Sequence, residues 1–282
     1  MKIGISAFAW TSQFDESHLG LLPWAKEHGF DGLEVTMFDP SDLPVGNMRR
    51  VFETNQLECS VCCILPNGVN PISPDADLRK KSILHLKHCI ETTAELGARL
   101  LGGPVFAPIG YLPEHRPTAD EWNWAVEAFQ SLGDALDKHE MTLAIEPVNR
   151  SETFFLRTAL EADKLCKAIG HPRIGVTIDT FHANIEEKDI ALAISLLGNR
   201  LRHLHASEND RGLLGEGHVD FHAIAKALMN TGYNGYLMIE GFGYSPEEKI
   251  GPGVLWADLA VSPEDIALKG ADYLRQILAA LA

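Results

Sequence analysis

The chain has 282 residues, of which 45% are hydrophobic and 22% are charged, and this composition is typical of a soluble globular protein with a sizeable core. The formal net charge of -15 at pH 7 opposes binding to phosphate backbones and to anionic lipid, and it favours a neutral small molecule or a cation as ligand. The sequence contains neither a signal peptide, nor a run of roughly 18 apolar residues, nor an even-numbered cysteine framework. We therefore expect a cytoplasmic protein with no membrane or nucleic-acid partner.

Eight short β-rich runs alternate with eight longer amphipathic stretches from one end of the chain to the other. The predicted strands are residues 2–8, 32–38, 58–65, 99–105, 142–148, 174–180, 201–207 and 236–242. The predicted helices are residues 18–28, 42–55, 77–96, 119–139, 156–169, 185–197, 221–230 and 263–281. Three helices are followed by a glycine just before the next strand, at Gly29, Gly97 and Gly232.

The regular order of these elements predicts the fold. Each predicted strand is followed by a helix, and the strands are apolar enough to be buried on both faces. We therefore predict an α/β fold, a single (β/α)8 TIM barrel over residues 1–282, rather than an open sheet. In such a barrel the loops after the strands build the active-site face. The loops after the third, fourth and eighth strands are long enough to form walls and a lid around a pocket.

Polar side chains stand at the carboxyl ends of four successive apolar strands, the fifth to the eighth. They are Glu146 in LAIEP, Asp179 in VTIDT, His205 in HLHAS and Glu240 in LMIEG. Three unpaired carboxylates on one side of the barrel mouth would be costly, and a divalent cation among them removes that cost. Oxygen ligands with one nitrogen suit Mn2+, with Mg2+ or Co2+ as alternatives. The competing interpretation is that each acid pairs separately with a lysine or an arginine.

Three further polar residues follow these strands at short distances and could point into the same mouth. They are Glu152 in the loop after the fifth strand, His182 three positions after Asp179, and Arg211 six positions after His205. Taken singly, each has a plainer interpretation: a loop salt bridge for Glu152, a helix N-terminal histidine for His182 and a solvated arginine for Arg211.

Aromatic residues of the predicted loops could form apolar walls of the pocket. The candidates are Phe8, Trp10, Phe106, Tyr111 and Trp256. For each of them ordinary packing is an equally good explanation. One of the neighbours Cys62 and Cys63 on the third strand should face the barrel interior, because successive side chains of a strand point to opposite faces.

Four segments of the second half, IEPVNRSE, VTIDTFHANIEE, HLHASENDRGLLGEGHVDF and YLMIEGF, resemble motifs of the sugar isomerase/epimerase superfamily with the xylose isomerase-like barrel. Within that superfamily the D-tagatose and D-psicose (D-allulose) 3-epimerases are the most similar group. The resemblance implies four metal ligands, namely Glu146, Asp179, His205 and Glu240. It further implies that Glu146 and Glu240 are the proton-transfer pair, and that the ketose is held near O1 to O3 by Glu152, His182 and Arg211.

The resemblance thus implies a metal-dependent ketose 3-epimerase that acts on a free ketohexose or ketopentose such as D-tagatose, D-fructose/D-psicose or L-ribulose. A cation polarises the ketone while Glu146 and Glu240 remove and return a proton on opposite faces of C3, through an enediolate. The resemblance also implies a homodimer or a homotetramer.

Three alternatives stay open on the sequence. The same metal site could serve an aldose–ketose, hydroxypyruvate-type or inosose enzyme. A DNA-repair nuclease of the endonuclease IV type shares the barrel, but it would need a basic DNA-facing surface and further histidines. A binding protein could keep the fold without catalysis, although an intact acid–base pair argues against it.

Overall fold

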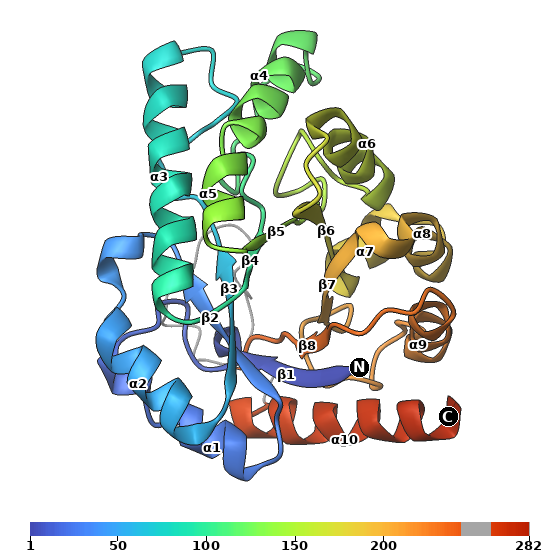
Figure 1. Cartoon of the computed structure of the whole chain (residues 1–282). Helices are drawn as coiled ribbons and strands as arrows, with labels where there is room; N and C mark the ends of the chain where they lie inside the picture. The colour runs from blue at the N-terminus through green and yellow to red at the C-terminus, as the bar shows by residue number, and fades with distance from the viewer. Residues whose placement is uncertain (244–260, 282) are drawn as a thin grey trace.

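A computed structural model describes residues 1–243 and 261–281 of the chain. Eight parallel strands pair in sequence order, and β8 pairs with β1 to close the barrel (Figure 1). The strands are β1 Lys2–Ser6, β2 Gly32–Met37, β3 Glu58–Cys63, β4 Leu100–Gly103, β5 Thr142–Ile145, β6 Ile174–Asp179, β7 Leu201–Ala206 and β8 Tyr236–Ile239. This closed parallel barrel confirms the predicted TIM-barrel fold.

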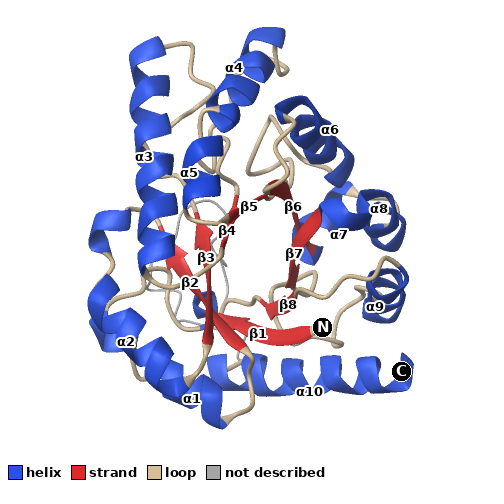
Figure 2. Cartoon of the chain, in the orientation of Figure 1, coloured by secondary structure: helices blue, strands red, loops and turns tan. Residues whose placement is uncertain are grey.

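Helices surround the ring of strands (Figure 2). They are α1 Leu21–Glu27, α2 Val45–Asn55, α3 Ala76–Glu95, α4 Ala119–Gln130, α5 Gly133–Lys138, α6 Ala159–Ile169, α7 Thr180–Glu186, α8 Ile190–Leu197, α9 Phe221–Asn230 and α10 Pro263–Leu281. Short 3-10 turns lie at Ala7–Ala9, Glu16–His18, Pro40–Asp42 and Gly198–Arg200. The glycines predicted to follow three helices all have positive φ: Gly29, Gly97 and Gly232.

The predicted helix 119–139 is in fact two helices, so that prediction was wrong. After α4, the hydroxyl of Ser131 donates a hydrogen bond to the carbonyl of Ala128. The chain resumes as α5 at Gly133, where a Cβ atom would lie 3.1 Å from the ring of His171. A glycine leaves more room for this close contact than a larger residue would.

The predicted helix 185–197 also differs, because two separate caps act on this segment. Asp179 accepts a hydrogen bond from the backbone N–H of Phe181 and so starts α7 directly after β6. Glu187 is extended and ends α7, and Asp189 then caps α8 by accepting from the N–H of Leu192. The short helix α7 places its first turn at the barrel mouth.

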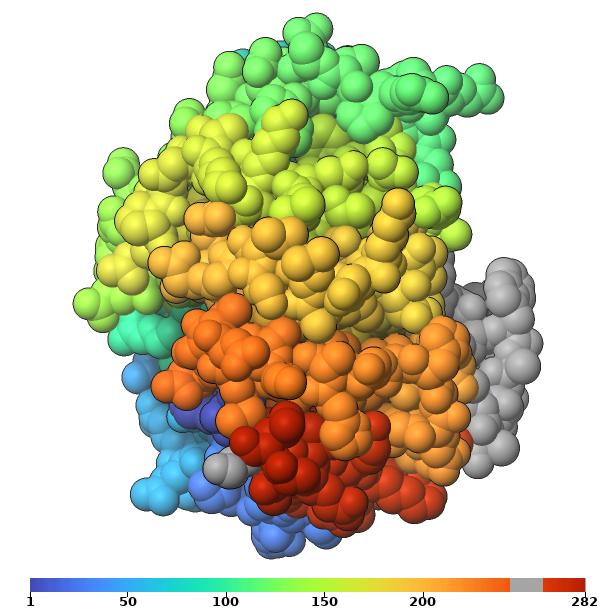
Figure 3. Space-filling view, turned by 90° about the vertical axis from the view of Figure 1, so that its right-hand side faces the viewer, coloured from blue at the N-terminus to red at the C-terminus, as the bar shows by residue number. Residues whose placement is uncertain are grey.

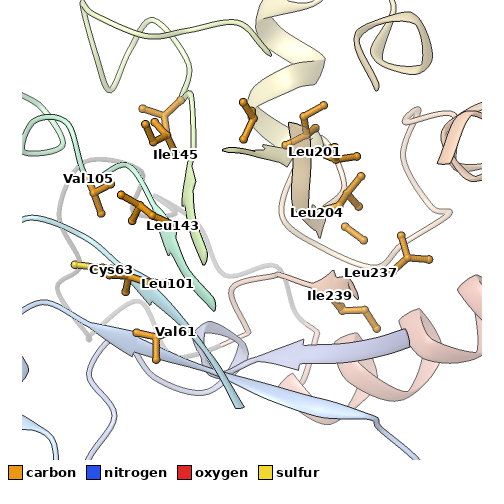
Figure 4. Close-up of a cluster of buried hydrophobic side chains, with 14 of the residues drawn as sticks. Val61, Cys63, Leu101, Val105, Leu143, Ile145, Leu201, Leu204, Leu237 and Ile239 are labelled. Carbon is orange, nitrogen blue, oxygen red and sulfur yellow. The ribbon is translucent and has the colours of Figure 1, made fainter. Parts of the chain in front are cut away.

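The two faces of the strands differ in polarity. Apolar side chains that face the surrounding helices come from five of the strands (Figure 4): Val61, Cys63, Leu101, Leu143, Ile145, Leu204, Leu237 and Ile239. The barrel interior is polar in its middle, where Ser6, Glu34 and Ser60 are aligned in register and Thr177 is aligned with His203. All five are buried. Barrel interiors usually carry bulky branched apolar residues, so this polar layer calls for a function.

One side of the barrel is covered by α6 to α10 (Figure 3). Four large apolar side chains on its helices α6, α8 and α9 are exposed: Leu160, Leu192, Leu196 and Met229.

None of the helices that the structure describes is long and apolar enough to cross a membrane. The homodimer or homotetramer stays a prediction.

Candidate active site

The four predicted metal ligands lie together at the carboxyl ends of β5 to β8. Asp179 is aligned in register with His205, and the backbone N–H groups of Glu146 and Glu240 continue the strand ladders by donating to the preceding strands. All four side chains are almost fully buried, with at most 4% of each residue exposed. Four buried titratable groups at one height of a barrel make a site whose charges depend on one another.

The donor atoms of this cluster converge around one point. Glu146, Asp179 and His205 each offer one ligand atom within 4.8 Å of the others. Nδ1 of His205 lies 3.4 Å from Oε1 of Glu146 and 3.7 Å from Oε2 of Glu240. Among the described residues neither ring nitrogen of His205 makes a hydrogen bond of good geometry, although Nε2 lies 2.8 Å from Oε1 of Glu34. A buried nitrogen without a partner, facing several carboxylates, fits a hard divalent cation.

Arg211 is buried among these acids rather than solvated. Its Nη1 donates at 2.6 Å to Oδ2 of Asp179 and at 2.6 Å to Oε2 of Glu240. The guanidinium centre lies 4.2 Å from the ring centroid of Phe181 and 4.9 Å from that of Phe242. The fork of Arg211 thus partly neutralises the carboxylates and is held flat between two rings.

Of the remaining two predicted contact residues, His182 contacts Arg211 directly, and Glu152 is linked to His182 through an asparagine that the sequence analysis missed. Nη2 of Arg211 lies 3.2 Å from Nε2 of His182. The amide nitrogen of Asn149 lies 2.9 Å from Nδ1 of His182 and donates at 2.9 Å to Oε1 of Glu152. The structure therefore brings Glu152, His182 and Arg211 together at the mouth. Asn149, only three residues after Glu146 in IEPVN, could have been found from that spacing.

Burial and neighbouring charges shift the pKa values of two acids of the cluster in opposite directions. Burial alone would raise the pKa of Asp179, but Arg211 and His182 outweigh burial and hold it below its usual range. Burial raises the pKa of Glu240 to about 8, and Asp179 and Glu146 act in the same direction. Without a cation, Glu240 therefore takes up a proton more readily than Asp179 does.

A cavity of about 230 Å³ opens beside this cluster. Its polar lining is Asn67, Glu146, Glu152, His182, Arg211 and Glu240. Its apolar lining includes Phe8, Phe38, Cys62, Ile64, Leu65 and Ile109. Cys62 is the one of the two neighbouring cysteines that faces inward, whereas Cys63 packs outside the barrel against Cys89 of α3.

Most of the aromatic residues predicted to form the walls serve elsewhere. Phe8 lines the cavity, but Trp10, Phe106 and Tyr111 are not among its described lining residues. Trp10 packs on Trp24, Phe106 packs on Phe155, and Tyr111 packs likewise on a phenylalanine ring. For these three, ordinary packing was the better explanation. Trp256 lies outside the described residues.

Sequence reasoning also missed Glu34, which lies in the barrel interior below the cluster. Its carboxylate is 2.8 Å from Nε2 of His205 and is fully buried. The signal was present in the sequence, since Glu34 is the only charged residue of β2, GLEVTM. An acid inside an otherwise uncharged buried strand needs a partner, and here that partner is a predicted metal ligand.

Comparison with known proteins identifies the family of this barrel. The model of the xylose isomerase-like TIM barrel family matches residues 22–277. A probable ketose 3-epimerase of Synechocystis sp. is 31% identical over 98% of this chain and 96% of its own length. An L-ribulose 3-epimerase of Mesorhizobium japonicum is 32% identical over 86% of this chain and 81% of its own length. The crystal structure of a D-allulose 3-epimerase from Methylomonas sp. has a TM-score of 0.92 at 26% identity, covering 99% of this chain and 98% of that one.

The family match spans the barrel from α1 into α10 and includes every residue of the cluster at the mouth. The fold and the sequence similarity agree along the whole matched range. This chain belongs to the xylose isomerase-like TIM barrel family.

Proposed function

We propose that this protein is a metal-dependent ketose 3-epimerase that acts on free ketoses. The relatives named above are carbohydrate epimerases, and this chain is likewise an isomerase-class enzyme. The proposed substrates are free ketohexoses or ketopentoses such as D-tagatose, D-fructose/D-psicose or L-ribulose. The proposed cation is Mn2+, with Mg2+ or Co2+ as alternatives.

The observation that carries this proposal is the placement of Glu146 and Glu240 on either side of His205, both lining the cavity. The two carboxyl groups come from β5 and β8, so they can approach a bound sugar from different directions. One removes the proton from C3 and the other returns a proton to the opposite face, which inverts that carbon. Epimerisation needs two such groups.

The cluster also supplies the electrophile that this proton transfer requires. A divalent cation held by Glu146, Asp179, His205 and Glu240 would withdraw electron density from the ketone and stabilise the charge that develops as C3 loses its proton. The apolar lining of the cavity excludes water beside the two glutamates. A drier site raises the proton affinity of a carboxylate and offsets the opposite effect of a neighbouring cation.

We propose that Glu152, His182 and Arg211 bind the sugar at its oxygens O1 to O3. All three line the cavity on the same side as the proton-transfer pair. Arg211 offers only donors, Glu152 accepts when ionised, and His182 can do either. Such a set can bind neighbouring hydroxyl and carbonyl oxygens and orient C3 between the two glutamates.

Deuterium exchange tests the proposal directly. The Mn2+-loaded protein in D2O is given D-fructose, D-tagatose and L-ribulose separately, and NMR follows the label. We expect deuterium at C3 together with the C3-inverted ketose, loss of both with EDTA, and recovery with Mn2+. Deuterium at C1 with formation of an aldose would instead identify an aldose–ketose isomerase. No exchange with any of the three ketoses would reject the proposed substrate class.

A further inference from the structure

The polar layer inside the barrel contains a carboxylate that the proposed reaction does not use. Glu34 of β2 has no solvent exposure. The hydroxyl of Ser60 on β3 donates to its Oε2 at 3.0 Å, and Ser60 and Ser6 flank Glu34 in register on the two adjacent strands. Small serine side chains on both sides leave Glu34 room to extend across the barrel interior toward β7.

Two histidines of β7 meet that carboxylate. Oε1 of Glu34 lies 2.8 Å from Nε2 of His205, and Oε2 lies 2.9 Å from Nε2 of His203. Both rings are buried, with at most 1% of either residue exposed. A buried carboxylate is very costly unless donors or cations surround it, so these imidazoles and Ser60 are what make Glu34 tolerable at this position.

The two ring nitrogens of His205 consequently face different partners. Nδ1 faces Glu146 and Glu240 at the barrel mouth, whereas Nε2 faces Glu34 in the interior. An ionised carboxylate can only accept a hydrogen bond, so the nitrogen with the shorter contact, Nε2 at 2.8 Å from Glu34 against Nδ1 at 3.4 Å from Glu146, is the one that this contact favours as protonated. The lone pair that remains in the neutral ring is then on Nδ1, which points to the cation site. The partner at one nitrogen therefore decides which nitrogen can bind a metal.

We propose that Glu34 is a positioning residue that holds His205 as the Nε2–H tautomer, with Nδ1 directed at the cation site. His203 and Ser60 hold the other oxygen of Glu34 and so fix the carboxylate itself. The inference rests on the proposed metal-dependent function. It extends the site by a residue from β2, on the opposite side of the barrel from the ligands.

Metal binding tests the inference without relying on activity. Metal-free wild type, Glu34→Gln and Glu34→Ala are titrated with Mn2+, and free Mn2+ is followed by electron paramagnetic resonance. We expect the variants to bind Mn2+ about 10–100-fold more weakly, as when the partner of a metal-bound histidine is removed. Asp163→Asn is the matched control, because Asp163 is a buried carboxylate paired with Lys167 and Arg200 outside the barrel.

A second measurement addresses the tautomer in the wild type, so the test does not depend on variants that fold. In the Mg2+-loaded protein, 15N NMR of the His205 ring, assigned by comparison with His205→Asn, should show a proton on Nε2. A proton on Nδ1 alone would overturn the inference, and so would Mn2+ affinities of folded Glu34 variants within about twofold of that of Asp163→Asn. A wild type that binds no Mn2+ would overturn the proposed function and this inference together, whereas unchanged variants beside a binding wild type would overturn only the inference.

Discussion

The two sides of the barrel mouth carry different chemistry. Strands β5 to β8 and the loops after them contribute all the acidic and basic side chains that line the cavity: Glu146, Glu152, His182, Arg211 and Glu240. Strands β1 to β3 and their loops contribute Phe8, Phe38, Cys62, Ile64 and Leu65 to the same cavity. One side is therefore built to move protons and the other to shape the pocket.

The difference between the two sides explains why the charged groups lie together on one side of the mouth. Buried carboxylates need cations or hydrogen-bond donors within a few ångströms, and Arg211 can serve Asp179 and Glu240 at once because they are close together. Glu34 is the one buried acid of β1 to β3, and it reaches the charged side below the mouth. Four changes test this division, and the largest effect is expected on the charged side.

Glu240→Gln should have the largest effect, because it removes a proton-transfer group and a cation ligand while keeping the shape of the side chain. We expect deuterium exchange at C3 to fall by about 10²–10⁴-fold. Glu121→Gln is the matched control, since Glu121 is a buried carboxylate that caps α4 away from the cavity. The control should lower the melting temperature and leave exchange unchanged. Exchange by Glu240→Gln within tenfold of the wild type would remove Glu240 from the proposed pair.

Arg211→Lys should have the next largest effect. Lysine keeps the charge but has one nitrogen in place of the fork, in which Nη1 donates to Asp179 and Glu240 while Nη2 contacts His182, and it loses the contacts of the guanidinium with two phenylalanine rings. Lost hydrogen bonds to charged groups predict a decrease in kcat/KM of about 10–150-fold. Arg173→Lys, in an ion pair with Asp137 outside the cavity, should leave kcat/KM unchanged. Equal kinetics for the two variants would show that Arg211 acts through its charge alone.

Ile64→Ala tests the apolar side, where we expect a smaller effect and one of a different kind. Removing apolar contacts should change the ratio of kcat/KM between a ketohexose and a ketopentose by about tenfold, because apolar pockets discriminate by only 1–3 kcal/mol per group. Mn2+ affinity should not change. The control is Leu84→Ala, at a side chain 66% exposed on α3. A loss of Mn2+ binding in Ile64→Ala would contradict the division between the two sides.

The smallest effect is expected at the end of the barrel opposite the mouth. There Lys2, Glu58 and Tyr236, the first residues of β1, β3 and β8, form a half-exposed cluster. Burial alone would raise the pKa of Glu58, but Lys2 and Tyr236 outweigh burial and lower it. A lowered pKa in the folded state stabilises the protein above the unfolded pKa, and that stabilisation is lost as the pH falls through the folded value.

Glu58→Gln should therefore reduce the free energy of unfolding by at most about 1 kcal/mol at pH 7, with unchanged kcat/KM. Urea unfolding at pH 7, 5.5 and 4 measures both variant and wild type. The difference between them should shrink toward the lowest pH, because the wild-type carboxylate becomes protonated there. A difference that grows on acidification would contradict the direction of the Glu58 shift.

How far the sequence predicted the structure depended on the kind of signal. Each ligand strand ends in one acid or histidine after an apolar run, as in VTIDT and LMIEG, and the strand period fixes which face those residues occupy. Trp10 and Phe106 gave no such signal, because an aromatic residue in a loop packs equally well in the core or in a pocket. The break between α4 and α5 lies where Gly133 comes close to His171, which is 38 residues away along the chain.

By itself, the sequence determined the order of strands and helices, the closed barrel and the four residues that end strands β5 to β8. These are local or periodic properties, since burial pattern and spacing are read along the chain. Only the tertiary structure decided that Arg211 is buried between Asp179 and Glu240, that Asn149 joins Glu152 to His182, and that Glu34 meets His205. Closure of the barrel brings β2 opposite β7 and so joins Glu34 to His205, while the packing of the loops at the mouth brings Arg211 and His182 to the acids of the neighbouring strands.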